Sequence, residues 1–148
     1  MRAEAISSRY EVGVYGADGR LVRTLRRTVP PVRLSAREVK AGETELNDEV
    51  RFHKLTRSAI PFGIPTNKPP ITTLSWSLDG ALWVQRSTAD GRPSESDVYD
   101  ASGKWIAIAE WPSSIGLAAG RYLMSGKTML ATTRDSSDVE SVVRLRFR

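Results

Sequence analysis

The chain has 148 residues, a formal net charge of +5 at pH 7 and no cysteine. Its length is that of one ordinary domain, and the 40% of hydrophobic residues predicts a folded core. Disulfides, thiolate metal sites and cysteine nucleophiles are excluded. No apolar run approaches the roughly 18 residues of a membrane span, and no signal-peptide h-region is present. This predicts a cytoplasmic protein if the chain is complete, and export if it is a piece of a longer precursor.

Residues 9–27 predict a β-hairpin, because Tyr10, Val12 and Val14 alternate with other residues before a turn that contains Gly19. The same turn pattern recurs twice along the chain. It reads YGADGRL at 15–21, WSLDGAL at 76–82 and YDASGKW at 99–105. Recurring hairpins with variable connections are typical of repeat arrays and propellers.

Residues 35–57 predict a helical insertion of one or two surface helices. Ser35 and Glu38 have the spacing of a capping box, and good helix formers follow them. Gly42 is expected to break this segment into two short pieces. The following stretch, 60–70, contains four prolines and is expected to be a stiff, extended connector.

From Ile71 onward the pattern is that of β-strands. Residues 71–111 predict four consecutive antiparallel strands, which is one complete propeller-sized meander sheet. Residues 114–148 predict three more strands, and the stretch 113–120 is expected to contribute to them. At the end of the chain apolar residues alternate strictly with arginines, which predicts a half-buried strand with a solvated outer face. The apolar set is Val143, Leu145 and Phe147, and the basic set is Arg144, Arg146 and Arg148.

The segments 68–86, 97–112 and 120–147 together resemble the last blades of bacterial six-bladed β-propellers of the NHL-related, mostly uncharacterised kind. The opening segment 10–27 is similar to the outer hairpin of a preceding blade. The resemblance implies an all-β fold over 1–148, a partial propeller of four-stranded antiparallel sheets with a helical insertion. A six-bladed ring needs more than twice this length. The chain is therefore expected to be a C-terminal piece of a longer protein, a truncated reading frame, or a half-ring that completes itself by oligomerising.

Such a partial array predicts open sheet edges, and the segment Tyr10 to Val14 is expected to be one of them. The expected partners at these edges are the rest of a longer propeller chain or another copy of the protein. An unknown protein or small ligand is a further expected partner. Nucleic acid is not favoured, because the arginines are dispersed along the chain instead of clustered on one element.

Several residues invite a chemical role, and for each a structural role is favoured. His53, the single histidine, is expected on the surface of the helical insertion, since a catalytic role needs several further residues. The run SGKT at 125–128 lacks the earlier glycine of a phosphate-binding loop and is expected to be a hairpin. The acidic residues before glycines are expected to form turns, and the tryptophans are expected to pack between sheets. These are Asp18, Asp79, Asp90, Asp100, Trp76, Trp83, Trp105 and Trp111.

The function predicted from these features is that of a non-catalytic scaffold or binding module for a protein or small ligand. Candidate residues of a binding surface are Arg20, Arg23, Arg144, Arg146, Trp76 and Trp83. No catalytic, cofactor or metal residue is predicted, and a divalent cation stays an open alternative. A second alternative, implied by the resemblance, is part of a metal-dependent, lactonase-like propeller hydrolase. A third is binding of anionic polymers through the arginine-rich strand faces.

Overall fold

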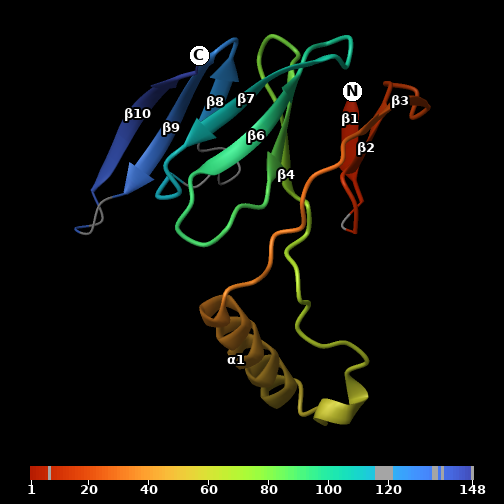
Figure 1. Cartoon of the computed structure of the whole chain (residues 1–148), viewed down its shortest axis with the longest axis vertical. Coiled ribbons are helices and arrows are strands. Elements are labelled where there is room, and N and C mark those ends of the chain that lie inside the picture. Colours follow the sequence, from red (N-terminus) through yellow and green to blue (C-terminus); the bar gives the residue numbers. More distant parts are fainter. Residues whose placement is uncertain (7, 116–121, 135–136, 138, 148) are drawn as a thin grey trace.

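The computed structural model consists of three antiparallel sheets that lie side by side, with one helix set apart from them (Figure 1). It describes residues 1–6, 8–115, 122–134, 137 and 139–147. The first sheet contains β1 (Arg2–Ala5), β2 (Glu11–Tyr15) and β3 (Leu21–Arg26). The middle sheet contains β4 (Ile71–Trp76), β5 (Leu82–Arg86), β6 (Ser94–Tyr99) and β7 (Trp105–Trp111). The last sheet contains β8 (Tyr122–Ser125), β9 (Thr128–Arg134) and β10 (Glu140–Arg146). The prediction of an all-β fold with a short helical insertion is confirmed.

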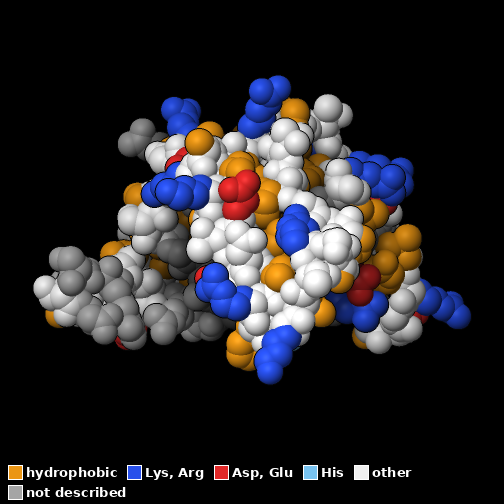
Figure 2. All heavy atoms as spheres, turned by 90° about the horizontal axis from the view of Figure 1, so that it is seen from below, with side chains coloured by type: hydrophobic (Ala, Val, Ile, Leu, Met, Phe, Trp, Pro, Cys, Tyr) orange, Lys and Arg blue, Asp and Glu red, His pale blue; other side chains and the backbone are white. Residues whose placement is uncertain are grey.

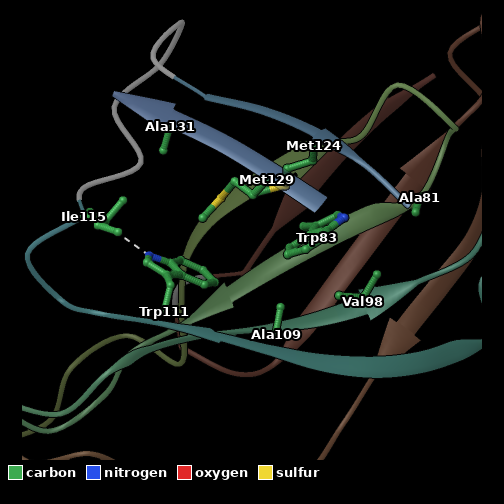
Figure 3. Packing of buried hydrophobic residues seen from close by; sticks show 9 residues of the cluster. All are labelled: Ala81, Trp83, Val98, Ala109, Trp111, Ile115, Met124, Met129 and Ala131. Atoms are coloured by element: carbon green, nitrogen blue, oxygen red, sulfur yellow. Dashed lines mark hydrogen bonds between the residues drawn. The ribbon is translucent and has the colours of Figure 1, made fainter. Parts of the chain in front are cut away.

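The middle sheet is covered on both faces, and the first three residues of β5, Leu82 to Val84, are all apolar for this reason. Leu82 and Val84 belong to a buried cluster with the first sheet, while Trp83 belongs to a second buried cluster with the last sheet. A strand buried on both faces reads as a continuous hydrophobic run instead of an alternating one. Figure 3 shows the second cluster, in which Trp83, Trp111 and Met129 converge. The ring of Phe147 contacts Trp83 edge-on, with 5.2 Å between the ring centroids.

The prediction of an unpaired edge at Tyr10 to Val14 is wrong. Strand β1 pairs antiparallel with β2 along its length, with Ala3 opposite Val14 and Ala5 opposite Val12. The sequence Arg-Ala-Glu-Ala of β1 alternates charged with small residues but contains no β-branched or aromatic residue. Its conformation follows from pairing with a strand whose Val12 and Val14 are buried against the middle sheet. The first sheet therefore has three strands, and its edges are β1 and β3.

The helical insertion forms one helix, α1 (Ala36–Phe52), followed by the short 3₁₀ helix η1 (Arg57–Ala59). The capping box is present, because Ser35 accepts from the Glu38 backbone while Glu38 accepts from the Ser35 backbone. The expected break at Gly42 is wrong. A β-carbon at Gly42 would lie 3.1 Å from the Ile64 side chain. The glycine instead lets the helix approach the returning connector closely.

The hairpin predictions for 71–111 and for the SGKT run are confirmed. Gly19, Gly80 and Gly103 have φ angles of 75°, 81° and 83°, which residues other than glycine rarely adopt. In the last sheet, Gly126 and Lys127 form the turn between β8 and β9. The predicted contribution of 113–120 falls mostly on residues 116–120, which lie outside the described residues. Among the described residues, no helix has the length and apolar character needed to cross a membrane.

Candidate functional site

A pocket of about 520 Å³ lies where the two connectors of the helical insertion leave and rejoin the sheets. We call it the connector pocket. The two connectors pair through an isolated antiparallel bridge between Arg33 and Asn67, and Lys68 donates its backbone N–H to the Val32 carbonyl. The walls come from residues 8–10, 27–32, 67–70 and 86–89, together with Arg92 and Glu95.

The wall of the connector pocket is rich in cations. It contains one carboxylate, Glu95, among five basic side chains. The basic residues are Arg9, Arg27, Lys68, Arg86 and Arg92. Three of the acids that pair with them, Glu11, Glu38 and Asp97, are not lining residues. Four of the five basic side chains are thus paired with a carboxylate, and Arg92 adds a cation with no ion pair among the described residues.

Asp97 lies behind this wall with a side chain that is 0% exposed. It forms an ion pair with Arg27, and its second carboxylate oxygen lies 3.5 Å from Nε of Arg86. Arg86 also donates to Glu95 at 2.5 Å. Neither Arg86 Nε nor Asp97 Oδ2 has a hydrogen-bond partner among the described residues. The carboxylate of Asp97 thus positions two of the pocket's guanidinium groups from behind.

Two tyrosines complete this buried polar group. The hydroxyl groups of Tyr10 and Tyr99 lie 3.1 Å apart in a hydrogen bond. Burial raises the pKa of Tyr10 far above its ordinary value, and the neighbouring Tyr99 and Asp97 raise it further. Both rings belong to the apolar cluster between the first and middle sheets. The phenol of Tyr10 therefore stays protonated and acts as a hydrogen-bonding group beside Asp97.

Lys68 and Arg92 differ in how their charge is held. Lys68 lies 2.6 Å from Glu38 and donates to the Thr88 carbonyl at 2.8 Å, so it is fixed against the start of α1. The hydrogen bond from Lys68 to Glu38 is the main reason that the pKa of Glu38 falls to about 2. The side chain of Arg92 makes no ion pair or hydrogen bond with any residue described. It is the cation of the pocket wall that is most available to a ligand.

The residues predicted as one binding surface lie in different places. Arg20 is exposed beside Asp18, and Arg23 donates to the Ala101 carbonyl at 3.0 Å, both on the first sheet's side. Arg144 and Arg146 are exposed on β10, on the opposite side of the middle sheet. Seen from below, lysines and arginines are scattered among other side chains (Figure 2). The two arginine sets thus form no single cationic face.

The predicted packing role of the tryptophans holds for two of the four. Trp83 is 1% exposed and Trp111 is 2% exposed, so Trp83 is a core residue and not part of a surface. Trp76 is 36% exposed and Trp105 is 45% exposed, so for these two the packing prediction is wrong. The guanidinium of Arg27 lies 4.8 Å from the centre of the Trp105 ring, in cation–π geometry.

The remaining candidates have structural roles. His53 ends α1 in an exposed position, 3.2 Å from Glu49, as predicted. Asp18 and Asp100 accept backbone N–H groups within their own turns, which confirms the turn prediction for them. Asp79 and Asp90 also lie in turns, as predicted, and in addition they connect elements. Asp79 accepts from the Gly126 backbone across two sheets, and Asp90 forms an ion pair with Arg37 of α1.

The connector pocket was not predicted from the sequence, although one signal was present. In β5 the alternation Leu82, Val84, Arg86 places an arginine in line with two core residues. In β6, Asp97 lies two positions before the core residue Tyr99, so a carboxylate also occupies a core-facing position. Charged residues at core-facing positions are seldom buried without a partner. Nothing matches this chain in comparisons with protein-family models, with curated proteins or with solved structures.

Proposed function

We propose that this protein is a non-catalytic binding module that takes a small anionic ligand, with a carboxylate or phosphate group, in the connector pocket. The observation that carries the proposal is the pocket wall, where five cationic side chains meet one carboxylate. Guanidinium groups recognise such anions with short, charge-assisted hydrogen bonds. Arg92 is the residue we expect to contact the ligand directly, because its charge has no partner in the described part of the chain.

The chemistry of the wall favours binding over catalysis. Its hydroxyl residues, such as Ser87 and Thr88, have no histidine beside them in the pocket lining. The one lining carboxylate, Glu95, is bonded to Arg86. A general base must lie within hydrogen-bond reach of the proton that it takes, and here a carboxylate oxygen is occupied by a guanidinium donor.

We further propose that the three sheets correspond to consecutive blades of a propeller of the NHL-related, six-bladed, bacterial kind. Three consecutive antiparallel meanders stacked through buried apolar faces support this view. In that arrangement the sheets act as a rigid scaffold. The connectors and loops that line the pocket then act as the binding surface, as is common where function is placed on loops over a stable framework.

Titration calorimetry with inorganic phosphate and with succinate tests the proposed ligand class. We expect binding of at least one probe in the millimolar range, and a loss of about tenfold or more in affinity in Arg92→Ala. Arg20→Ala removes an arginine outside the pocket whose side chain is 89% exposed, and it is the control. Absence of binding by both probes, or equal losses in the two variants, would contradict the proposal.

A further inference from the structure

Within the part of the chain that the structure describes, the first sheet has a free strand position that faces an uncovered apolar surface. The first and middle sheets run in the same order across their contact. β1 contacts β4, the valines of β2 share a cluster with Leu82 and Val84 of β5, and β3 contacts the turn between β6 and β7. A fourth strand of the first sheet, next to β3, would therefore face β7. The middle sheet has a fourth strand there, and the first sheet ends at β3.

Three residues of β7 form the apolar surface, which we call the β7 row: Trp105, Ile106 and Ile108. Their register shows which way they face. Trp105 pairs with Tyr99, Ile108 pairs with Asp97, and a bulge accommodates Ile106 between these pairs. Tyr99 belongs to the cluster shared with the first sheet. The β7 row therefore lies on the face directed to the first sheet, yet its members are 45%, 53% and 38% exposed.

The opposite face of β7 shows that this exposure is specific to one side. Ala109 and Trp111, which face the last sheet, are each 2% exposed. Trp111 donates its indole N–H to the Ile115 carbonyl (Figure 3). Its ring centroid lies 6.4 Å from that of Phe147. The last sheet also has three strands, but other side chains cover β7 there. Among the described residues, β7 is therefore covered on the face directed to the last sheet and uncovered on the face directed to the first sheet.

Strand β3 places the free edge beside the β7 row. The Arg23 guanidinium donates to the Ala101 carbonyl, and Arg27, just after β3, stacks on Trp105. A β-carbon at Gly103 would lie 3.3 Å from the Leu25 side chain, so β3 follows the start of β7 closely. A strand added to the free side of β3 would lie over Ile106 and Ile108.

The charge of β3 indicates what kind of strand fits. The segment 20–27 contains four arginines and no acidic residue. Arg20 pairs with Asp18 and Arg26 pairs with Glu11, yet their side chains stay 89% and 71% exposed. A second copy of β3 would bring like charges together, which disfavours self-pairing. An incoming strand with carboxylates on its outer face and apolar residues on its inner face matches both the arginines and the β7 row.

We propose that the free edge of β3 is a docking site for an extended segment of a protein partner in which acidic and apolar residues alternate. The segment adds to the first sheet as a fourth strand. Its main chain pairs with β3, its apolar side chains cover the β7 row, and its carboxylates lie near Arg20 and Arg26. Strand addition of this kind uses backbone hydrogen bonds for affinity and alternate side chains for specificity.

Two labelled octapeptides test the proposal by fluorescence anisotropy with the full chain. One alternates Glu with Val and Ile, and the other carries Lys in place of every Glu. We expect the Glu peptide to bind about tenfold or more tightly than the Lys peptide. We also expect Ile108→Lys and Ile106→Lys each to weaken it about tenfold, because both place a charge against its apolar face. N-methylation of the amides along one peptide edge is expected to abolish binding, and methylation along the other edge to have little effect.

Val142→Lys is the matched control, because Val142 is 73% exposed on β10, on the far side of the middle sheet. Circular dichroism of each variant checks that it folds, which we expect because both isoleucines are exposed. No binding of the Glu peptide, equal binding of the two peptides, or equal effects of Ile108→Lys and Val142→Lys would overturn the proposal. Binding that is insensitive to both methylation patterns would do so as well, since it would show charge attraction without strand addition.

Discussion

Removal of the Asp97 carboxylate should lower the free energy of unfolding by a large amount for so small a side chain. Its side chain is fully buried, and it compensates the charges of Arg27 and Arg86. In Asp97→Ala, the guanidinium groups of Arg27 and Arg86 lose the carboxylate that compensates their charge. Breaking a buried ion pair by removing one partner costs about 3 to 5 kcal/mol. We expect about 3 kcal/mol here, because the Arg27 side chain is 32% exposed and Arg86 keeps its contact with Glu95.

Urea unfolding followed by tryptophan fluorescence measures this loss, since Trp83 and Trp111 are buried in the folded state. A loss of 3 kcal/mol lowers the folded-to-unfolded ratio by somewhat more than a hundredfold. Asp48→Ala is the control, because Asp48 pairs with Arg51 on the exposed helix and should change stability by less than about 1 kcal/mol. A similar small loss for Asp97→Ala would refute the view that its carboxylate compensates buried charge.

Three further predictions concern the substitution of single residues. Met129→Ala should cost about 2 to 5 kcal/mol in urea unfolding, because Met129 is 0% exposed, whereas Leu123→Ala, at a 57% exposed site, should cost far less. Glu38 has a pKa lowered from 4.5 to about 2, so its contribution to stability is complete above pH 4.5 and is lost as the pH falls toward 2. The difference in urea midpoint between the wild type and Glu38→Gln should shrink over that range, and a constant difference would contradict this assignment. Ser35→Ala removes the cap of α1 and should destabilise the helix by about 1 kcal/mol, seen as faster proteolysis of the insertion.

The hairpins could be predicted from sequence because their determinants are local. A glycine with positive φ fixes each turn, and the residues on either side alternate between core and solvent. The alternation of Val143, Leu145 and Phe147 with Arg144 and Arg146 gave the correct faces of β10, where the apolar set packs against the middle sheet. The capping box likewise placed the start of α1 correctly.

The errors concern interactions between distant segments. Strand β1 forms because β2 offers it an edge, and nothing within Arg2–Ala5 shows that. Gly42 lies within a continuous helix, and its lack of a side chain leaves room for Ile64, which is beyond the end of the helix. The connector pocket joins Arg27, Lys68 and Arg86 from three separate stretches of the chain. All three side chains are charged. Their proximity depends on how the sheets stack, which the local sequence does not show.

Arg27 links the two sites proposed here, which leads to a last expected outcome. Its guanidinium pairs with Asp97 behind the connector pocket and also stacks on Trp105 of the β7 row. A strand that covers Trp105 removes water from this stack and holds the guanidinium more firmly in the pocket wall. We therefore expect the Glu peptide to tighten phosphate binding, and phosphate to tighten peptide binding by the same factor, because coupling between two binding sites is reciprocal.

Calorimetric titrations with and without the second ligand measure that factor. Arg27→Met keeps much of the stem that packs against Trp105 but removes the charge that reaches Asp97. If Arg27 carries the coupling, the factor falls to one in this variant, while Arg144→Ala, at an exposed position of β10 away from both sites, leaves it unchanged. Coupling that persists in Arg27→Met would show that the two sites communicate by another route. Two tight but uncoupled sites in the wild type would show that the guanidinium is already held as firmly without the strand as with it.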